Sequence, residues 1–206
     1  MLLSHKTSIK LNKDYSNMIG HMCYAAYKRW NVCNYERLHY KELGLDTYPD
    51  WYYQKKVHKD DLWYKSLPSQ TAQEVCKLLD KSWKSFYKLV ETHGVMNPQP
   101  PKFKHSKMSV TYMQNGITHT AGSDIVRLSV SKQMKDYMSK TYDISDNYIY
   151  LKNQIFNSLS MHYFFIGGNI CKRPMVIRLA MNIWLTIDFY YKKMFIIFAI
   201  LKMKCI

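Results

Sequence analysis

The sequence is poor in acidic residues and has no long apolar run, and both shortages narrow the class of protein. Asp and Glu total 15 against 30 Lys and Arg, which gives a formal net charge of +15. Such an excess favours a polyanionic partner, either nucleic acid or an anionic membrane surface. The longest apolar run near the end, Met194–Leu201, is far shorter than the ~20 residues that span a bilayer. We therefore expect no membrane-spanning segment.

Paired cysteines are missing as well. None of the five cysteines stands in a C-x-x-C pair, which argues against a zinc ribbon and against a thioredoxin-like redox motif. An odd, scattered set is typical of reduced thiols in the cytoplasm. No apolar run follows Lys6 and Lys10, so no signal peptide is predicted. We expect a cytoplasmic protein.

Motifs of the common enzyme classes do not occur. There is no P-loop, no dinucleotide-binding fingerprint, no H-E-x-x-H and no nucleophile elbow. The eight histidines show no metal-ligand spacing with cysteine. From these absences we expect no metal, no cofactor and no small-molecule substrate.

The clearest element that is present is a helix predicted from about Leu67 to Thr92. Apolar residues recur there every three or four positions, from Ala72 to Val90, and form a nearly ideal stripe. Four lysines fall on the other side of this helix. Lysines on an outer helix face are usually only solvated, but these could also follow a phosphate backbone. They are Lys77, Lys81, Lys84 and Lys88.

Aromatic and basic residues alternate in residues 51–64, ahead of this helix. Such a composition can stack bases while it neutralises phosphates. It can equally be a loop whose rings pack on a core, and the sequence leaves both readings open. The candidates for stacking are Tyr52, Tyr53 and Trp63.

The rest of the chain up to residue 157 combines one further helix with short strands. Residues 5–11 suggest a short strand, and residues 15–40 show helical spacing. After the stiff segment Asn97–Pro101 the apolar period changes to two, and Asn115-Gly116 predicts a hairpin between 109–113 and 117–120. Lys102 and Lys104, in the P-K-F-K segment, are further candidates for phosphate contact. The predicted order is strand, helices, strands.

Residues 158–206 have a different texture. Met, Ile, Phe and Tyr dominate residues 161–206, with Asp188 as the one carboxylate and with no amphipathic period that we recognise. We interpret the segment as an irregular tail, either unfolded or produced by a frameshift.

Two stretches of the sequence, and more weakly a third, match a known pattern: L-P-S-Q-T-A-Q-E-V-C-K-L-L-D-K-S-W-K-S-F-Y-K-L (67–89), P-P-K-F-K (100–104) and Trp30-Asn31. On these residues the chain resembles the N-terminal part of the TnpB (OrfB) family of transposon-encoded, RNA-guided nucleases. The resemblance covers about the first three-quarters of the chain.

The resemblance implies an α+β fold in which a helical recognition bundle is inserted into a small wedge-like β-barrel. The implied boundaries are 1–13 for the first barrel strand, 14–96 for the recognition domain, 97–157 for the remaining barrel strands and 158–206 for the atypical tail.

The nuclease chemistry of that family is not expected here. RuvC-type cleavage needs several carboxylates that hold two metal ions about 4 Å apart. Ile187-Asp188-Phe189 is the one comparable site, it lacks the family's flanking glycines, and no Asp or Glu follows it. The C-x-x-C pairs of the family's zinc ribbon are absent too. We expect a truncated relative with no autonomous nuclease activity.

Three functional hypotheses remain. The first is nucleic-acid binding by a truncated TnpB-like protein, with guide-type RNA, duplex DNA or both as partners and a full-length relative as a further one. The second is a non-functional relic of such a gene. The third is a basic membrane-surface protein whose apolar C-terminus docks on anionic lipid.

Overall fold

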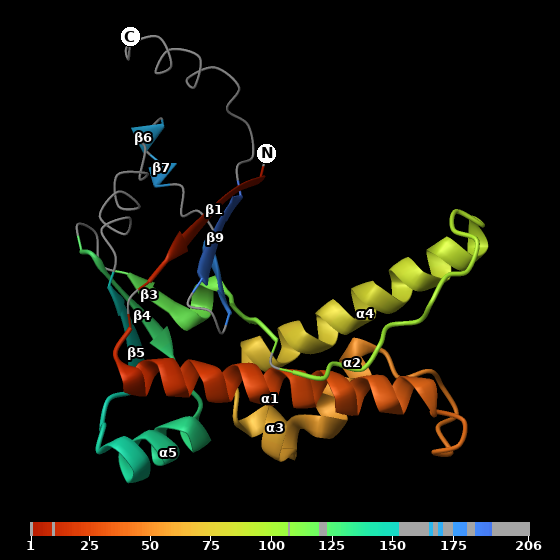
Figure 1. Cartoon of the computed structure of the whole chain (residues 1–206), viewed down its shortest axis with the longest axis horizontal. Coiled ribbons are helices and arrows are strands. Elements are labelled where there is room, and N and C mark those ends of the chain that lie inside the picture. The colour runs from red at the N-terminus through yellow and green to blue at the C-terminus, as the bar shows by residue number, and fades with distance from the viewer. Residues whose placement is uncertain are drawn as a thin grey trace.

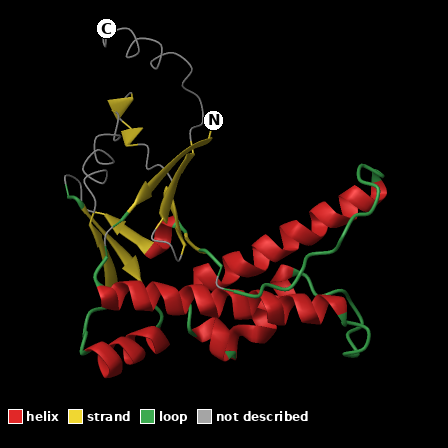
Figure 2. Ribbon diagram, viewed as in Figure 1, coloured by secondary structure: helices red, strands yellow, loops and turns green. Residues whose placement is uncertain are grey.

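The fold combines helices and antiparallel strands, as the sequence predicted (Figures 1 and 2). The computed structural model describes residues 9, 11–106, 108–119 and 123–152, and the backbone of residues 2–8 and of four later strands. The helices are α1 (Lys13–Leu38), α2 (Trp51–Val57), α3 (Leu62–Lys65), α4 (Ser69–Glu91) and α5 (Lys132–Tyr142). The strands are β1 (Leu2–Ser8), β2 (Val110–Tyr112), β3 (Ile117–His119), β4 (Ile125–Ser129), β5 (Tyr148–Lys152), β6 (Phe165–Ile166), β7 (Asn169–Ile170), β8 (Met175–Ala180) and β9 (Trp184–Tyr190).

Helix α1 is the longest helix that the structure describes, and the other helices pack along it. It begins where the Asn12 side chain accepts a hydrogen bond from the Tyr15 amide at 2.8 Å, which satisfies one free donor of the first turn. Its buried positions include the small residues Ala25 and Ala26, which let neighbouring elements approach closely. In Figure 1 the strands lie on one side of α1 and α5 lies on the other.

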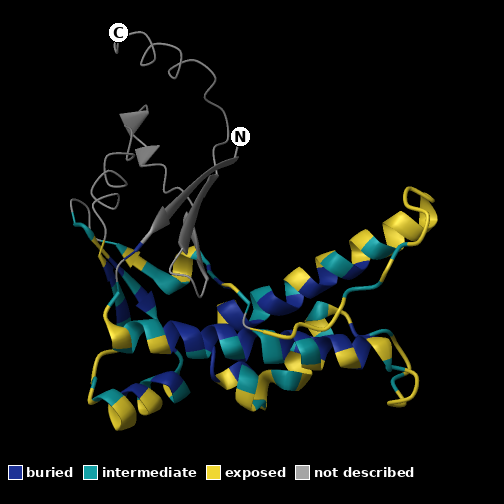
Figure 3. Cartoon of the chain, viewed as in Figure 1, coloured by how far each residue is buried: buried dark blue, intermediate teal, exposed yellow. Residues whose placement is uncertain are grey.

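Helix α4 confirms the predicted apolar stripe over its first four turns. Ala72, Val75, Leu79 and Trp83 are all buried, as the spacing required. The stripe then leaves the core: Val90 is 43% exposed, and Figure 3 shows the far end of α4 projecting from the molecule. The prediction was therefore wrong at Val90, because a periodic stripe does not reveal where its packing partner ends.

Two antiparallel sheets, ordered β1-β9-β8-β2 and β3-β4-β5, contain most of the strands, and β6 pairs with β7 alone. Neither larger sheet closes on itself among the described strands. Strand β1, from the start of the chain, pairs with β9 along its whole length. Strands from both ends of the chain thus share one sheet, and the helices are inserted between them.

The hairpin predicted at Asn115-Gly116 does not form. Strand β2 pairs with β8, whereas β3 pairs with β4, so the two strands beside the turn belong to different sheets. A two-residue hairpin turn of this sequence needs positive φ at its glycine. Gly116 does not have positive φ, and its amide instead donates to the Met113 carbonyl in a 3-10 turn (Gln114–Gly116).

The tail also differs from its prediction where the structure describes it. Strands β6 to β9 all lie in the segment that we interpreted as irregular, and β8 pairs with both β2 and β9. The missed signal is a period of two in residues 184–190, where Leu185, Ile187 and Phe189 alternate with Thr186 and Asp188.

Tyr112 connects the sheets to α1. It is fully buried, and its hydroxyl donates to the Ser129 carbonyl of β4 at 3.0 Å and lies 3.3 Å from Met22 Sδ of α1. Since burial disfavours the phenolate, the pKa of Tyr112 is raised and the ring stays neutral. One side chain therefore joins β2, β4 and α1.

The adjacent residues Leu78 and Leu79 test the packing of α4. Leu79 is fully buried and Leu78 is 47% exposed. We expect Leu79→Ala to lower the free energy of unfolding by roughly 2–5 kcal/mol, since it leaves a cavity. Leu78→Ala should change it by about 0.5 kcal/mol or less. Urea unfolding followed by circular dichroism measures both, and equal losses would contradict the described orientation of α4.

Candidate nucleic-acid interface

The four predicted lysines of α4 lie on one stripe, as their spacing indicated. Lys81 and Lys88 are exposed. Lys77 is bonded to Glu74 at 2.7 Å, and Lys84 to Asp80 at 2.8 Å. The ammonium groups of both lysines are at least partly exposed, so each remains accessible to a further anion.

Helix α2 adds aromatic rings beside this stripe. The rings of Trp51 and Tyr52 lie 3.8 Å apart with 36° between their planes. Lys55 Nζ stands 4.7 Å from the Trp51 centroid and 4.8 Å from the Tyr52 centroid, and Lys77 Nζ reaches over Trp51 from α4 at 4.9 Å. These contacts are within cation–π range and join the two helices into one surface. We call it the α2–α4 surface; it comprises Trp51, Tyr52, Lys55, Lys77, Lys81, Lys84 and Lys88.

Of the predicted stacking residues, Tyr52 alone belongs to this surface. It is 59% exposed. Tyr53 is half-buried in the first turn of α2, where its amide donates to the capping Asp50 side chain at 2.8 Å. Trp51 was missed, although it stands next to Tyr52 in the same aromatic segment, because nothing in the sequence indicated which rings are accessible.

Lys102 and Lys104 lie elsewhere, along α1. The Asn31 carboxamide both donates to and accepts from the backbone of Lys104, each at 2.8 Å, and the Trp30 indole donates to the Lys102 carbonyl at 3.1 Å. The Lys104 ammonium lies 4.9 Å from the Trp30 ring centroid. The structure thus brings together Trp30-Asn31 and P-K-F-K, two segments that the sequence singled out separately.

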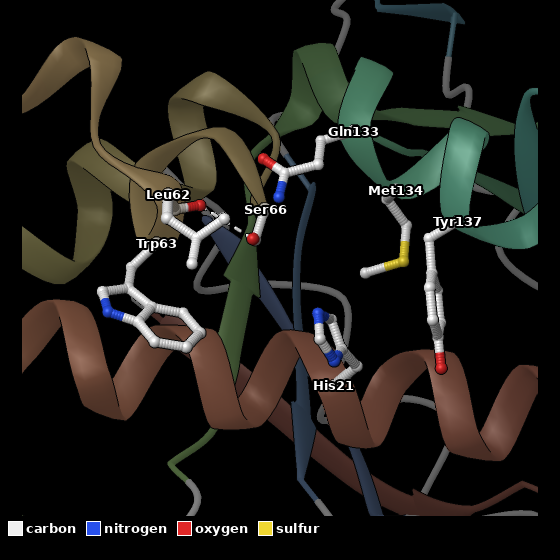
Figure 4. Close-up of a pocket in the computed structure, with 7 residues that line it drawn as sticks. All are labelled: His21, Leu62, Trp63, Ser66, Gln133, Met134 and Tyr137. Atoms are coloured by element: carbon white, nitrogen blue, oxygen red, sulfur yellow. Dashed lines mark hydrogen bonds between the residues drawn. The ribbon is translucent and has the colours of Figure 1, made fainter.

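Trp63 is also away from the α2–α4 surface. It is a half-buried residue of α3 whose ring packs edge-on against Tyr24 of α1 at 5.6 Å. It lines a cavity of about 240 Å³ where α1, α3 and α5 meet (Figure 4).

A buried polar network fixes α2 and α4 on α1. Arg37 of α1 is almost fully buried; its Nε donates to the Gln54 side chain at 3.0 Å, and its Nη1 to Asp80 at 3.1 Å. The other carboxylate oxygen of Asp80 forms an ion pair with Lys84. One carboxylate of α4 therefore neutralises a buried arginine and holds a lysine of the α2–α4 surface.

Gln54 connects α2 to α1. Its side-chain amide donates to the Cys33 backbone carbonyl and to the Glu36 carboxylate, both at 2.8 Å. The backbone carbonyl of Gln54 accepts a hydrogen bond from Arg29 at 2.9 Å. Because Gln54 is fully buried, each of these bonds satisfies a group that water cannot reach. The segment 51–64 therefore contains both buried residues, such as Gln54, and exposed ones, such as Tyr52.

Glu36, His58 and Asp61 continue this network toward the surface. His58 Nε2 lies 3.2 Å from Glu36, and His58 Nδ1 lies 2.7 Å from Asp61. Burial by itself lowers the pKa of His58, but the hydrogen bond to Glu36, the charge of Glu36 and the hydrogen bond to Asp61 together outweigh it and raise the pKa above its usual 6.5. Burial would raise the pKa of Glu36, but hydrogen bonds from His58 and Gln54 lower it below 4.5.

Two cysteines meet beside Arg29. Cys33 and Cys76 have their sulfur atoms 3.7 Å apart, and Arg29 Nη2 donates to Cys76 Sγ at 3.3 Å. The hydrogen bond from Cys33 lowers the pKa of Cys76 to about 6; burial opposes this, and the charge of Arg29 supports it. Over the described ranges, no group of three or more His, Cys, Asp or Glu residues is placed to hold a metal ion.

No family model matches this sequence, and a search of curated proteins found none similar to it. In the part of the chain that the structure describes, no helix has the length and apolarity needed to cross a bilayer.

Asp80 and Glu74, both acidic residues of α4, provide a matched test of the network. Asp80→Ala leaves the buried guanidinium of Arg37 without its counter-charge, and we expect a loss of roughly 3–5 kcal/mol in unfolding free energy. Glu74→Ala breaks a partly exposed pair and should cost less than about 1 kcal/mol. Urea titration of the two variants gives the comparison, and similar small losses would mean that the network contributes little.

The pKa shift of His58 predicts a pH dependence. Folding raises this pKa, so the stabilisation is fully present below pH 6.5 and is lost as the pH rises through the folded-state value. We expect the difference in unfolding free energy between wild type and His58→Gln to shrink as the pH rises above 6.5 and through the raised folded-state pKa of His58. His39→Gln, which breaks a more exposed pair with Glu42, is the control and should show a small difference throughout. If the difference in unfolding free energy between wild type and His58→Gln grew with pH, the pKa of His58 would not be raised by folding.

Proposed function

We propose that this chain binds nucleic acid, structured guide-type RNA or duplex DNA, through the α2–α4 surface and has no nuclease activity of its own. The observation that carries the proposal is the Trp51–Tyr52 ring pair with Lys55 and Lys77 over it, continuous with the lysine stripe of α4. The ring of Tyr52 is exposed and that of Trp51 is partly buried. Aromatic rings beside cations suit both halves of a nucleotide, since bases stack on aromatic faces and phosphates attract ammonium groups.

The dimensions of the stripe suit a polyanion. Lys77 and Lys88 are separated by about 16 Å along the helix axis at 1.5 Å per residue. That length corresponds to about five base steps of 3.4 Å. A backbone that runs along α4 can therefore contact several of the lysines together, and release of its counterions would supply most of the affinity.

We further propose a TnpB-like architecture, in which α1 to α4 form the recognition part and the strands belong to a wedge-like barrel. Support comes from the sequence resemblance and from the pairing of β1. This strand precedes α1 to α4 in the chain, yet it shares a sheet with β9, β8 and β2, which follow them. The proposed lack of nuclease activity is supported by the carboxylates: Asp188 is the one acidic residue in 161–206, and a two-metal site needs several.

A charge-reversal pair tests the α2–α4 surface. We expect Lys81→Glu with Lys88→Glu in the full chain to weaken binding of an RNA hairpin or a DNA duplex roughly tenfold or more at about 50 mM salt. The slope of the logarithm of the binding constant against the logarithm of the salt concentration should become shallower by the contribution of roughly two phosphate contacts. Fluorescence anisotropy across a salt series measures both quantities.

The control for this experiment is Lys13→Glu with Lys140→Glu, two exposed lysines of α1 and α5. It changes the net charge by the same amount on other elements. Equal losses in the two double variants would mean that net charge alone drives binding, and the α2–α4 surface would be discarded.

A further inference from the structure

A concave site separate from the α2–α4 surface lies where α1, α3 and α5 meet. Its volume is about 240 Å³, and the residues that the argument uses are His21, Trp63, Ser66, Gln133, Met134 and Tyr137. Figure 4 shows Trp63 on one side of the space, Met134 and Tyr137 across from it, and His21 directed into it from α1. Pockets for drug-sized ligands start near 300 Å³. This cavity therefore suits a smaller group.

Flat rings form its walls. The rings of His21 and Tyr137 lie 5.2 Å apart and nearly parallel, with 18° between their planes. Burial lowers the pKa of His21, so its imidazole is neutral at pH 7 and offers a ring face instead of a cation. Trp63 is held in place by its edge contact with Tyr24. Such walls favour a planar aromatic ligand, which stacks on them.

Polar groups border the same space. The Gln133 carboxamide carries two N–H donors and an acceptor oxygen. The Ser66 hydroxyl donates to the Leu62 carbonyl at 2.8 Å and keeps its lone pairs as acceptors. Proteins recognise an unpaired base by stacking its faces on aromatic rings and by hydrogen-bonding its edge to donors and acceptors beside them.

A larger cavity of about 690 Å³ adjoins this one and shares Gln133 with it. Lys59, Lys65 and Lys132 line it, together with residues at the starts of α4 and α5. Asp60 and Asp136 line it as well, and Asp60 is paired with Lys65 at 3.0 Å. The lysines outnumber the carboxylates, and the amide groups that begin α4 and α5 add further attraction for an anion.

We propose that the two cavities form a subsite for one unpaired nucleotide, with its base between Trp63 and Tyr137 and its phosphate beside the lysines of the larger cavity. The subsite deepens the proposed nucleic-acid binding and rests on it. A free nucleotide and an unpaired nucleotide within a strand present the same chemistry, and the experiment separates them.

The test uses the full chain and three probes. They are a hairpin with one unpaired 2-aminopurine, the fully paired duplex of the same length, and free 2-aminopurine nucleotide. We expect the unpaired probe to bind about tenfold more tightly than the paired one, since stacking of one base contributes on that scale. We also expect its fluorescence to be quenched on binding.

Two variants and one control locate the effect. Tyr137→Ala removes a ring of the wall, and Gln133→Leu removes the carboxamide while keeping its bulk. Each should abolish the preference for the unpaired probe and leave binding of the duplex unchanged. Gln114→Leu, at an exposed position of the turn between β2 and β3, should change neither. Thermal unfolding of each variant shows whether it is folded. If Tyr137→Ala does not fold, the result for Gln133→Leu decides whether the subsite exists.

The outcomes distinguish the subsite from the α2–α4 surface. Equal binding of paired and unpaired probes by wild type would overturn the subsite alone. Weaker binding of the paired and unpaired probes by the Lys81→Glu, Lys88→Glu variant, together with quenching that depends on Tyr137 in the wild-type background, supports both. Binding of the free nucleotide but of neither strand would keep the subsite, with a free nucleotide as its ligand, and discard the proposed function. Absence of binding by all three probes would overturn both.

Discussion

Two arginines of α1 are buried where α2 and α4 pack on it, and the arrangement of the helices depends on how their charges are balanced. Removing a guanidinium from water is costly unless hydrogen bonds and a counter-charge replace the lost hydration. For Arg37 these come from Gln54 on α2 and Asp80 on α4. For Arg29 they come from the Gln54 carbonyl, Cys76 and the more distant Asp61 at 3.7 Å. These contacts therefore tie both helices to α1, since a position without them would leave each buried charge with fewer partners.

This constraint also shapes the exposed side of the helices. Asp80 binds the buried Arg37 through one oxygen and the exposed Lys84 through the other, so the core and the basic stripe share a carboxylate. Gln54 fixes the helix that carries Trp51 and Tyr52, and thereby holds their rings beside Lys77.

The sequence-based interpretation was wrong mainly where pairing between distant segments decides the structure. The Asn115-Gly116 turn is present, but the strands beside it pair with β8 and β4 and not with each other. The tail has strands because β1 and β2 offer edges to it, which local composition does not reveal. Val90 continues an apolar period beyond the point where α4 has anything to pack against. The candidate site divides in the same way, with Tyr52 exposed on α2 and Trp63 packed between helices.

The sequence alone determined the basic charge, the place of the long helices, the buried stripe from Ala72 to Trp83 and the spacing of the lysines opposite it. These are local properties, because a period of 3.6 fixes which side chains share a face. The tertiary structure alone decided that Arg37 meets Asp80 and that Asn31 binds the backbone of Lys104, 73 positions away. It also decided which rings are exposed. Such pairs leave no periodic trace, since they depend on how helices cross and on which buried polar groups must be satisfied.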